Sequence, residues 1–147
     1  QDAIINRHVW IEMFTYGVLA SSLLLWHYWH ALNNDGALVA VSAAFTGLVV
    51  YELVRLVVLR TNYQIPWFSN PWLSVALAAS FIVQIAVLYI PQVAELFEIN
   101  SFGLNNWLII GAGSATIFIV MKIVRRLLER YLPEVQPQFS PDHYNRT

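Results

Sequence analysis

The stretch ALVAVSAAFTGLVVYELVRLVVL, residues 37–59, decides the fold of this protein. Its side chains are almost all apolar, and only Glu52 and Arg55 carry a charge. At a rise of about 1.5 Å per residue, a helix of this length crosses the roughly 30 Å hydrocarbon core of a bilayer. The stretch therefore predicts a transmembrane helix that contains one acidic and one basic residue.

Three further apolar stretches are long enough to span a bilayer, at residues 9–32, 71–90 and 104–128. Turn formers separate them: Asn33-Asn34-Asp35-Gly36 precedes the second span, and Pro66 lies before the third. Asn70 followed by Pro71 is typical of a helix start, with a capping side chain and then a proline at the first helical position. The sequence thus predicts an all-α fold, an integral membrane four-helix bundle at residues 1–132, followed by a polar, proline-containing tail at 133–147.

The composition excludes several other classes of protein. Of the 147 residues, 58% are hydrophobic and only 12% are charged, which is about half the charge of a soluble protein. The formal net charge of −1 gives nucleic-acid phosphates no field to follow, so we expect no nucleic-acid partner. The chain has no cysteine, which excludes disulfides and thiolate metal sites. The class that remains is an integral protein of the lipid bilayer.

The basic residues indicate how the chain is oriented, because Lys and Arg concentrate in short cytoplasmic loops. Arg7 precedes the first span, Arg60 lies between the second and third, and four basic residues end the fourth: Lys122, Arg125, Arg126 and Arg130. The connections at residues 33–36 and 92–103 contain no Lys or Arg. We therefore expect a multi-pass protein of the cell membrane with both termini in the cytoplasm.

Glu52 and Arg55 are the ionisable residues of the second span, where a charge costs at least about 2.5 kcal/mol near the bilayer centre. Their spacing of three residues places them on one helix face, so they can pair directly. One interpretation is a structural ion pair that neutralises itself. The other is that Glu52, which we expect deep in the span and away from water, lines a cation pathway. Arg55 is then its counter-charge or reaches toward the interface.

Other residues in the spans have predicted roles in packing. Gln84, in the middle of the third span, is predicted to form an interhelical hydrogen bond. Gly111 and Gly113 belong to a patch of small residues that lets a neighbouring helix approach closely. Glu12 follows Arg7 closely, so we expect it at the cytoplasmic interface with no special role.

His27 and His30, one turn apart in the first span, suggest a minor alternative, the binding of haem or a metal ion. No histidine of another span lies at a matching depth, because His8 is at the opposite end of the first span and His143 is in the tail. The aromatic residues around the pair favour anchoring at the membrane rim instead.

Several short motifs resemble the C-terminal transmembrane domain of P-type cation-transporting ATPases, the last four of their ten membrane helices. Ala44-Phe45-Thr46 is similar to a small-Phe-Thr segment of that family, and Asn70-Pro71-Trp72-Leu73 is similar to its Asn-x-Trp-Leu helix start. Tyr89-Ile90-Pro91 resembles the family's Tyr-x-Pro helix exit, and Leu104 with Trp107 resembles its Leu-x-x-Trp re-entry. The likeness covers nearly the whole chain and is calcium-pump-like.

The resemblance implies ion transport across a membrane, driven in a full pump by formation of an aspartyl phosphate. It places Glu52 at the family position that supplies an ion-coordinating carboxylate in calcium-type pumps, where sodium-type relatives carry Gln. The transported cation, calcium or another, prefers oxygen ligands. The partners that the resemblance implies are the remaining helices and the cytoplasmic domains of the ATPase.

Two residues depart from the family's pattern. Arg55 stands where relatives often have Asn or Asp, and Lys122 stands where the family usually has Glu. A positive charge one turn from Glu52 opposes cation binding. The pair is therefore either a built-in counter-charge or the mark of a site that no longer binds ions.

The chain lacks the Asp-Lys-Thr-Gly-Thr phosphorylation motif, so we assign it no catalytic residue and no cofactor of its own. It begins with Gln1, and one hypothesis is a segment of a longer pump whose ion site it supports through Glu52. The alternative is a stand-alone four-helix membrane scaffold or accessory subunit, which associates with another membrane protein and has no transport activity.

Overall fold

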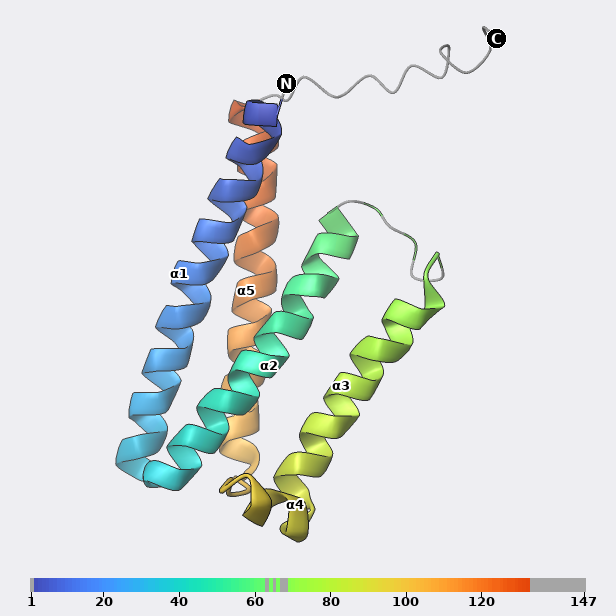
Figure 1. Ribbon diagram of the computed structural model, residues 1–147. Coiled ribbons are helices and arrows are strands. Elements are labelled where there is room, and N and C mark those ends of the chain that lie inside the picture. The colour runs from blue at the N-terminus through green and yellow to red at the C-terminus, as the bar shows by residue number, and fades with distance from the viewer. Residues whose placement is uncertain (1, 63, 65, 67–68, 133–147) are drawn as a thin grey trace, which may run out of the picture.

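The computed structural model describes residues 2–62, 64, 66 and 69–132, with side chains from Arg7 onward. This part of the chain contains five helices and no strand: α1 (Asp2–Asn34), α2 (Ala37–Asn62), α3 (Pro71–Tyr89), α4 (Pro91–Leu96) and α5 (Leu104–Tyr131) (Figure 1). Four of them, α1, α2, α3 and α5, are long and apolar enough to cross a membrane. The predicted all-α membrane fold is confirmed, while the tail predicted at residues 133–147 lies outside the described residues.

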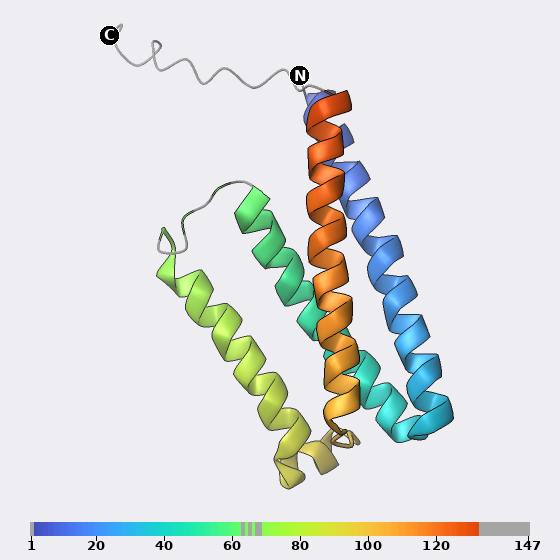
Figure 2. The same cartoon turned by 180° about the vertical axis from the view of Figure 1, so that it is seen from behind.

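The helices form a packed group of three with a fourth leaning outward. α1, α2 and α5 lie side by side, whereas α3 packs against α2 and α4 and diverges from the group toward its own N-terminus (Figures 1 and 2). The start of α1 and the end of α5 lie at one end of the molecule, and the α1–α2 turn and α4 lie at the other.

Local sequence features set where the helices begin and end. Gly36 has a φ of +93°, a conformation that favours glycine, and its N–H donates to the Ala31 carbonyl at 3.1 Å. This turn makes α1 and α2 antiparallel. Asn70 Oδ1 accepts from the Leu73 N–H at 3.3 Å and caps α3, whose first residue is Pro71.

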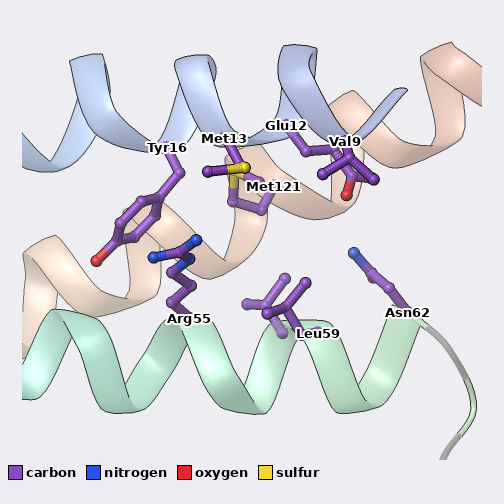
Figure 3. Close-up of a pocket in the computed structure, with 9 residues that line it drawn as sticks. Val9, Glu12, Met13, Tyr16, Arg55, Leu59, Asn62 and Met121 are labelled. Carbon is purple, nitrogen blue, oxygen red and sulfur yellow. The ribbon is translucent and has the colours of Figure 1, made fainter. Parts of the chain in front are cut away.

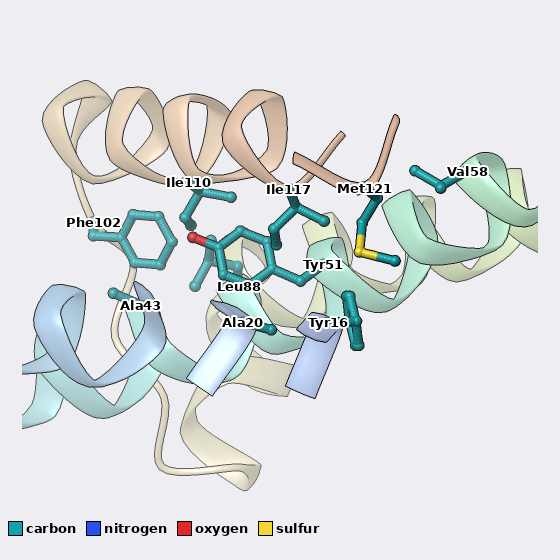
Figure 4. Close-up of a cluster of buried hydrophobic side chains, with 10 residues drawn as sticks. All are labelled: Tyr16, Ala20, Ala43, Tyr51, Val58, Leu88, Phe102, Ile110, Ile117 and Met121. Carbon is teal, nitrogen blue, oxygen red and sulfur yellow. The ribbon is translucent and has the colours of Figure 1, made fainter. Parts of the chain in front are cut away.

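A cluster of ten buried residues joins α1, α2 and α5 with the ends of α3 and of the loop before α5 (Figure 4). Its members are Tyr16, Ala20, Ala43, Tyr51, Val58, Leu88, Phe102, Ile110, Ile117 and Met121. Gly113 of α5 allows the Tyr51 side chain to lie against the α5 backbone, because a Cβ at this position would overlap the Tyr51 hydroxyl. Gly113 thus lets α2 and α5 approach closely.

Side-chain hydrogen bonds fasten α3 and the following loop to the group. The Tyr89 hydroxyl at the end of α3 donates to the Phe102 carbonyl at 3.2 Å and accepts from Trp107 Nε1 of α5 at 2.6 Å. Ser42 Oγ of α2 accepts from the Asn100 N–H at 2.9 Å. These bonds hold α3 near α5 at one end only, which accounts for the outward lean of its other end.

Candidate functional site

The carboxylate of Glu52 is held by two groups of this chain. Its Oε1 accepts a hydrogen bond from the Tyr16 hydroxyl at 3.0 Å, and its Oε2 accepts one from Arg55 Nη1 at 3.4 Å. The guanidinium carbon of Arg55 lies 5.1 Å from the centroid of the Tyr16 ring, within the range of a cation–π contact. These three residues form one connected group, the Glu52 cluster.

The antiparallel pair of α1 and α2 brings Tyr16 to Glu52. Both residues lie at similar distances along the chain from the turn at Gly36, so the two helices place them at the same level. Tyr16 is absent from the sequence prediction because a search for charged residues inside the spans passes over a tyrosine. An approximately equal spacing from the turn, 20 residues for Tyr16 and 16 for Glu52, is the signal that points to this part of α1.

Glu52 faces outward from the described helices. Its side chain is 48% exposed, and that of Arg55 is 34% exposed. The described helices do not enclose Glu52, because Tyr51 takes the inward position of α2 and is 1% exposed. Around Glu52 lies an otherwise apolar stripe with helical spacing, the outward face of α2: Leu38, Val41, Phe45, Leu48 and Leu56.

Gln84 contributes to helix packing at a different place. Its Nε2 donates to Thr46 Oγ1 at 2.9 Å, and both residues are buried between α3 and α2. Thr46 precedes Glu52 by six residues, which places it about 9 Å away along α2 and about 120° around the helix. Gln84 is therefore not part of the Glu52 cluster.

His27 and His30 lie at the opposite end of α1 from Glu12. His27 is fully buried, and its Nε2 lies 2.9 Å from Asn106 Oδ1 of α5. Asn106 Nδ2 donates to Asp35 Oδ2 at 3.0 Å, so the amide oxygen is left to accept from His27. Within the described ranges, no group of three or more His, Cys, Asp or Glu residues is placed to hold a metal ion.

Glu12 is more than an interfacial residue. It is 6% exposed, and its Oε1 lies 3.3 Å from Arg125 Nη1 of α5. Arg125 also pairs with Glu129 at 2.8 Å, and Lys122 Nζ donates to Asn62 Oδ1 at 3.0 Å. The expectation that Glu12 has no special role is thus wrong, because its charge is buried and paired between α1 and α5.

A pocket of about 130 Å³ separates the Glu52 cluster from Glu12 (Figure 3). Arg55 reaches into it from α2, next to the ring of Tyr16, and Glu12 lies further along α1. The remaining lining is mainly apolar and comes from all three packed helices: Val9, Met13, Val58, Leu59, Asn62 and Met121. Arg55 therefore pairs with one carboxylate, that of Glu52, and shares a pocket with a second, that of Glu12.

The chain matches a family model described as "Cation transporting ATPase, C-terminus" over residues 1–127. It is 22% identical over 148 residues to mouse "Calcium-transporting ATPase type 2C member 2", an alignment that covers 96% of this chain and 16% of that protein. It is 37% identical over 60 residues to "Calcium-transporting ATPase 4, endoplasmic reticulum-type" of Arabidopsis thaliana, covering 41% of this chain and 6% of that protein.

A bacterial relative, "Probable cation-transporting ATPase F" of Mycobacterium tuberculosis, is 28% identical over 130 residues, which is 82% of this chain and 14% of that protein. No solved structure matches the chain. The chain spans at most 16% of the length of these three relatives, and the family match extends over nearly all of its length. This chain therefore belongs to the family of cation-transporting ATPase C-terminal domains.

Proposed function

We propose that this chain is the C-terminal membrane domain of an ATP-driven cation pump and that Glu52 supplies one carboxylate to the pump's ion-binding site. The observation that carries the proposal is the outward position of Glu52, midway along the apolar helix α2. A carboxylate facing lipid at that depth costs at least about 2.5 kcal/mol. Other protein helices that cover this face remove the carboxylate from lipid and add ligands to it.

The outward face of α2 fits such a covering partner. Phe45, Leu48 and Leu56 surround Glu52 with apolar surface, so the carboxylate and its partner Arg55 are a polar patch on an otherwise apolar face. A hard cation such as calcium needs six to eight oxygen ligands, and Glu52 with Tyr16 offers few of them. The remaining ligands come, in this proposal, from the other membrane helices of the pump.

The proposed cation is calcium. Two of the relatives reported above are named calcium-transporting ATPases, and the sequence resemblance described above, which implies a coordinating carboxylate at Glu52, supports the same ion. The proposed partners are the remaining helices and cytoplasmic domains of the pump, and the proposed location is the cell membrane. Both termini lie in the cytoplasm in this proposal, because Arg7, Arg60 and Arg130 are at that end.

The test is ATP-driven uptake of ⁴⁵Ca²⁺ by vesicles that contain the whole pump with this domain. Glu52→Gln keeps the size of the side chain and removes its charge. It should raise the half-saturating calcium concentration at least about tenfold, which corresponds to about 1.4 kcal/mol. Glu95→Gln is the matched control, because Glu95 is an exposed carboxylate of α4. Equal calcium affinity in the Glu52→Gln pump and the wild type would contradict the proposal.

A second candidate function is a membrane scaffold or accessory subunit without transport activity. The observation that favours it is that both oxygens of Glu52 already have partners within this chain, Tyr16 and Arg55. Under this hypothesis the ion pair only stabilises the fold. The protein then co-purifies with another membrane protein, and neither Glu52→Gln nor Arg55→Gln changes the calcium affinity of ATP-driven uptake.

A further inference from the structure

We propose that Arg55 is a tethered counter-cation that occupies Glu52 while the site is empty and moves into the adjacent pocket, toward Glu12, when a transported cation binds. This inference rests on the proposed function, because it requires that Glu52 bind the cation. It concerns what the site does between transport events. A carboxylate in a membrane must be neutralised when its cation leaves. Arg55 supplies the positive charge that neutralises Glu52, so the carboxylate does not need to bind a proton.

The first position of Arg55 is the one in the structure. Its Nη1 lies 3.4 Å from Glu52 Oε2, at the long end of hydrogen-bonding distance. The pair is held by this one contact, and 34% of the Arg55 side chain is exposed. A divalent cation that binds the Glu52 carboxylate repels the guanidinium at this distance. The contact is therefore one that an incoming cation can displace.

The second position is the pocket that Arg55 already lines. Its volume of about 130 Å³ exceeds that of several water molecules. Glu12, at its far side, precedes Tyr16 by four residues and lies on the same face of α1, about one turn or 5.4 Å further along. A shift of about one helical turn along the pocket thus takes the guanidinium from the level of Tyr16, whose ring it now lies over, toward the level of Glu12.

The charges around the pocket allow Glu12 to receive a second cation. Glu12 currently pairs with Arg125 at 3.3 Å, but Arg125 holds Glu129 at the shorter distance of 2.8 Å. Lys122 bonds to Asn62 and not to Glu12. When Arg55 approaches Glu12, Arg125 therefore keeps a partner in Glu129. No ionisable group loses its counter-charge in this exchange.

The main test measures how calcium affinity depends on pH in vesicles of the whole pump. Glu52 pairs with Arg55 on its own helix, Glu12 and Tyr16 of α1 line the same pocket, Arg125 of α5 pairs with Glu12, and the buried His8 precedes Glu12 by four residues on α1. In the wild type, Arg55 neutralises empty Glu52, so the half-saturating calcium concentration should change little between pH 6 and 8. If the half-saturating calcium concentration of the wild type changed nearly tenfold per pH unit, protons would be competing with calcium for Glu52, and the inference would be overturned.

Substitutions of Arg55 show whether its charge competes with calcium for Glu52 or only stabilises the fold. Arg55→Gln removes the competing charge and should lower the half-saturating calcium concentration severalfold at pH 8, while making it strongly pH-dependent. Arg55→Lys keeps the charge and should behave like the wild type in both respects. If Glu52→Gln weakens calcium binding but Arg55→Gln leaves it unchanged or weaker, the inference is wrong and the proposed function stands. If Glu52→Gln has no effect, the proposed function itself fails.

A double-mutant cycle tests the second position. Glu12→Gln removes the acceptor in the pocket, so Arg55 should leave Glu52 less readily and calcium affinity should fall severalfold. In the Arg55→Gln background the same Glu12→Gln change should have no effect on affinity, because no guanidinium needs to move. An equal loss of affinity in both backgrounds would show that Glu12 acts only through the Arg125 pair and would overturn the pocket as the destination of Arg55.

Discussion

The hydroxyl of Tyr16 on α1 donates a hydrogen bond to Glu52 Oε1 on α2 at 3.0 Å. Tyr16 is 6% exposed, whereas the Glu52 side chain is 48% exposed. The buried tyrosine thus fixes one oxygen of the carboxylate, while the other oxygen, paired with Arg55, lies at the exposed side. Glu52 is therefore anchored to the packed group of α1, α2 and α5 through Tyr16, while its exposed side faces away from that group.

Removing this hydroxyl should have a measurable cost in stability. We expect Tyr16→Phe to lower the free energy of unfolding of the purified protein in detergent micelles by about 1 kcal/mol, the net value of one hydrogen bond. Thermal unfolding measures the change. Tyr131→Phe serves as the control, since Tyr131 is 71% exposed at the end of α5. Equal destabilisation by both variants would show that the bond to Glu52 contributes nothing.

The close approach of α2 and α5 depends on Gly113. Gly113→Ala would drive a Cβ into the Tyr51 side chain, whose ring carbon Cζ lies 2.8 Å from that position. We expect a loss of about 1–3 kcal/mol, the usual cost of overpacking. Gly111→Ala is the matched control on the same helix, because nothing lies within 4 Å of its Cβ position. That substitution should be neutral or slightly stabilising.

A second variant tests the cause of the loss at Gly113. Tyr51→Phe removes the hydroxyl that a Cβ at position 113 would overlap, so the double variant should recover part of the stability. Thermal unfolding of the two single variants and the double variant gives the interaction energy. Strictly additive losses would contradict the proposed contact.

The ion pair of Glu52 and Arg55 also makes a prediction about stability. Arg55→Leu leaves Glu52 without its cation, and we expect a loss of about 2–3 kcal/mol, because an unpaired carboxylate then faces the hydrocarbon of the micelle. Replacing both residues, with Glu52→Gln and Arg55→Leu together, removes the unpaired charge and should restore most of the stability. A double variant that is less stable than Arg55→Leu alone would contradict this account of the pair.

The predicted orientation can be tested by labelling, since the chain contains no cysteine of its own. In a pump without other cysteines, Arg130→Cys at the end of α5 should react with a membrane-impermeant maleimide only from the cytoplasmic side. Glu95→Cys on α4, at the other end of the molecule, should react only from the opposite side. Labelling of both from one side would rule out the predicted topology.

The sequence was sufficient to predict the number and type of the membrane helices. The apolar runs that start at residues 37, 71 and 104 correspond to the starts of α2, α3 and α5, because turn formers and Pro71 mark those positions. The sequence did not predict which side of each helix faces inward. Nearly every residue of the spans is apolar, so hydrophobic periodicity cannot distinguish the inward side of Tyr51 from the outward side of Glu52.

The candidate site was predictable only in part for the same reason. Glu52 and Arg55 stand out because they are charged residues in an apolar run, and their pairing follows from helical spacing. Tyr16 and Glu12 join them through the antiparallel arrangement of α1 and α2 and through a pairing with α5, two features of tertiary structure. The outward lean of α3 likewise depends on where Tyr89 and Trp107 meet, which no local pattern encodes.

The most direct test of the central claim is equilibrium binding of ⁴⁵Ca²⁺ to the purified whole pump in the absence of ATP. The wild type is compared with Glu52→Gln, and Glu95→Gln is the control. We predict that Glu52→Gln either loses one bound ion or binds calcium at least about tenfold more weakly, while Glu95→Gln matches the wild type. The same affinity and the same number of bound ions in all three proteins would contradict the assignment of Glu52 to the ion site.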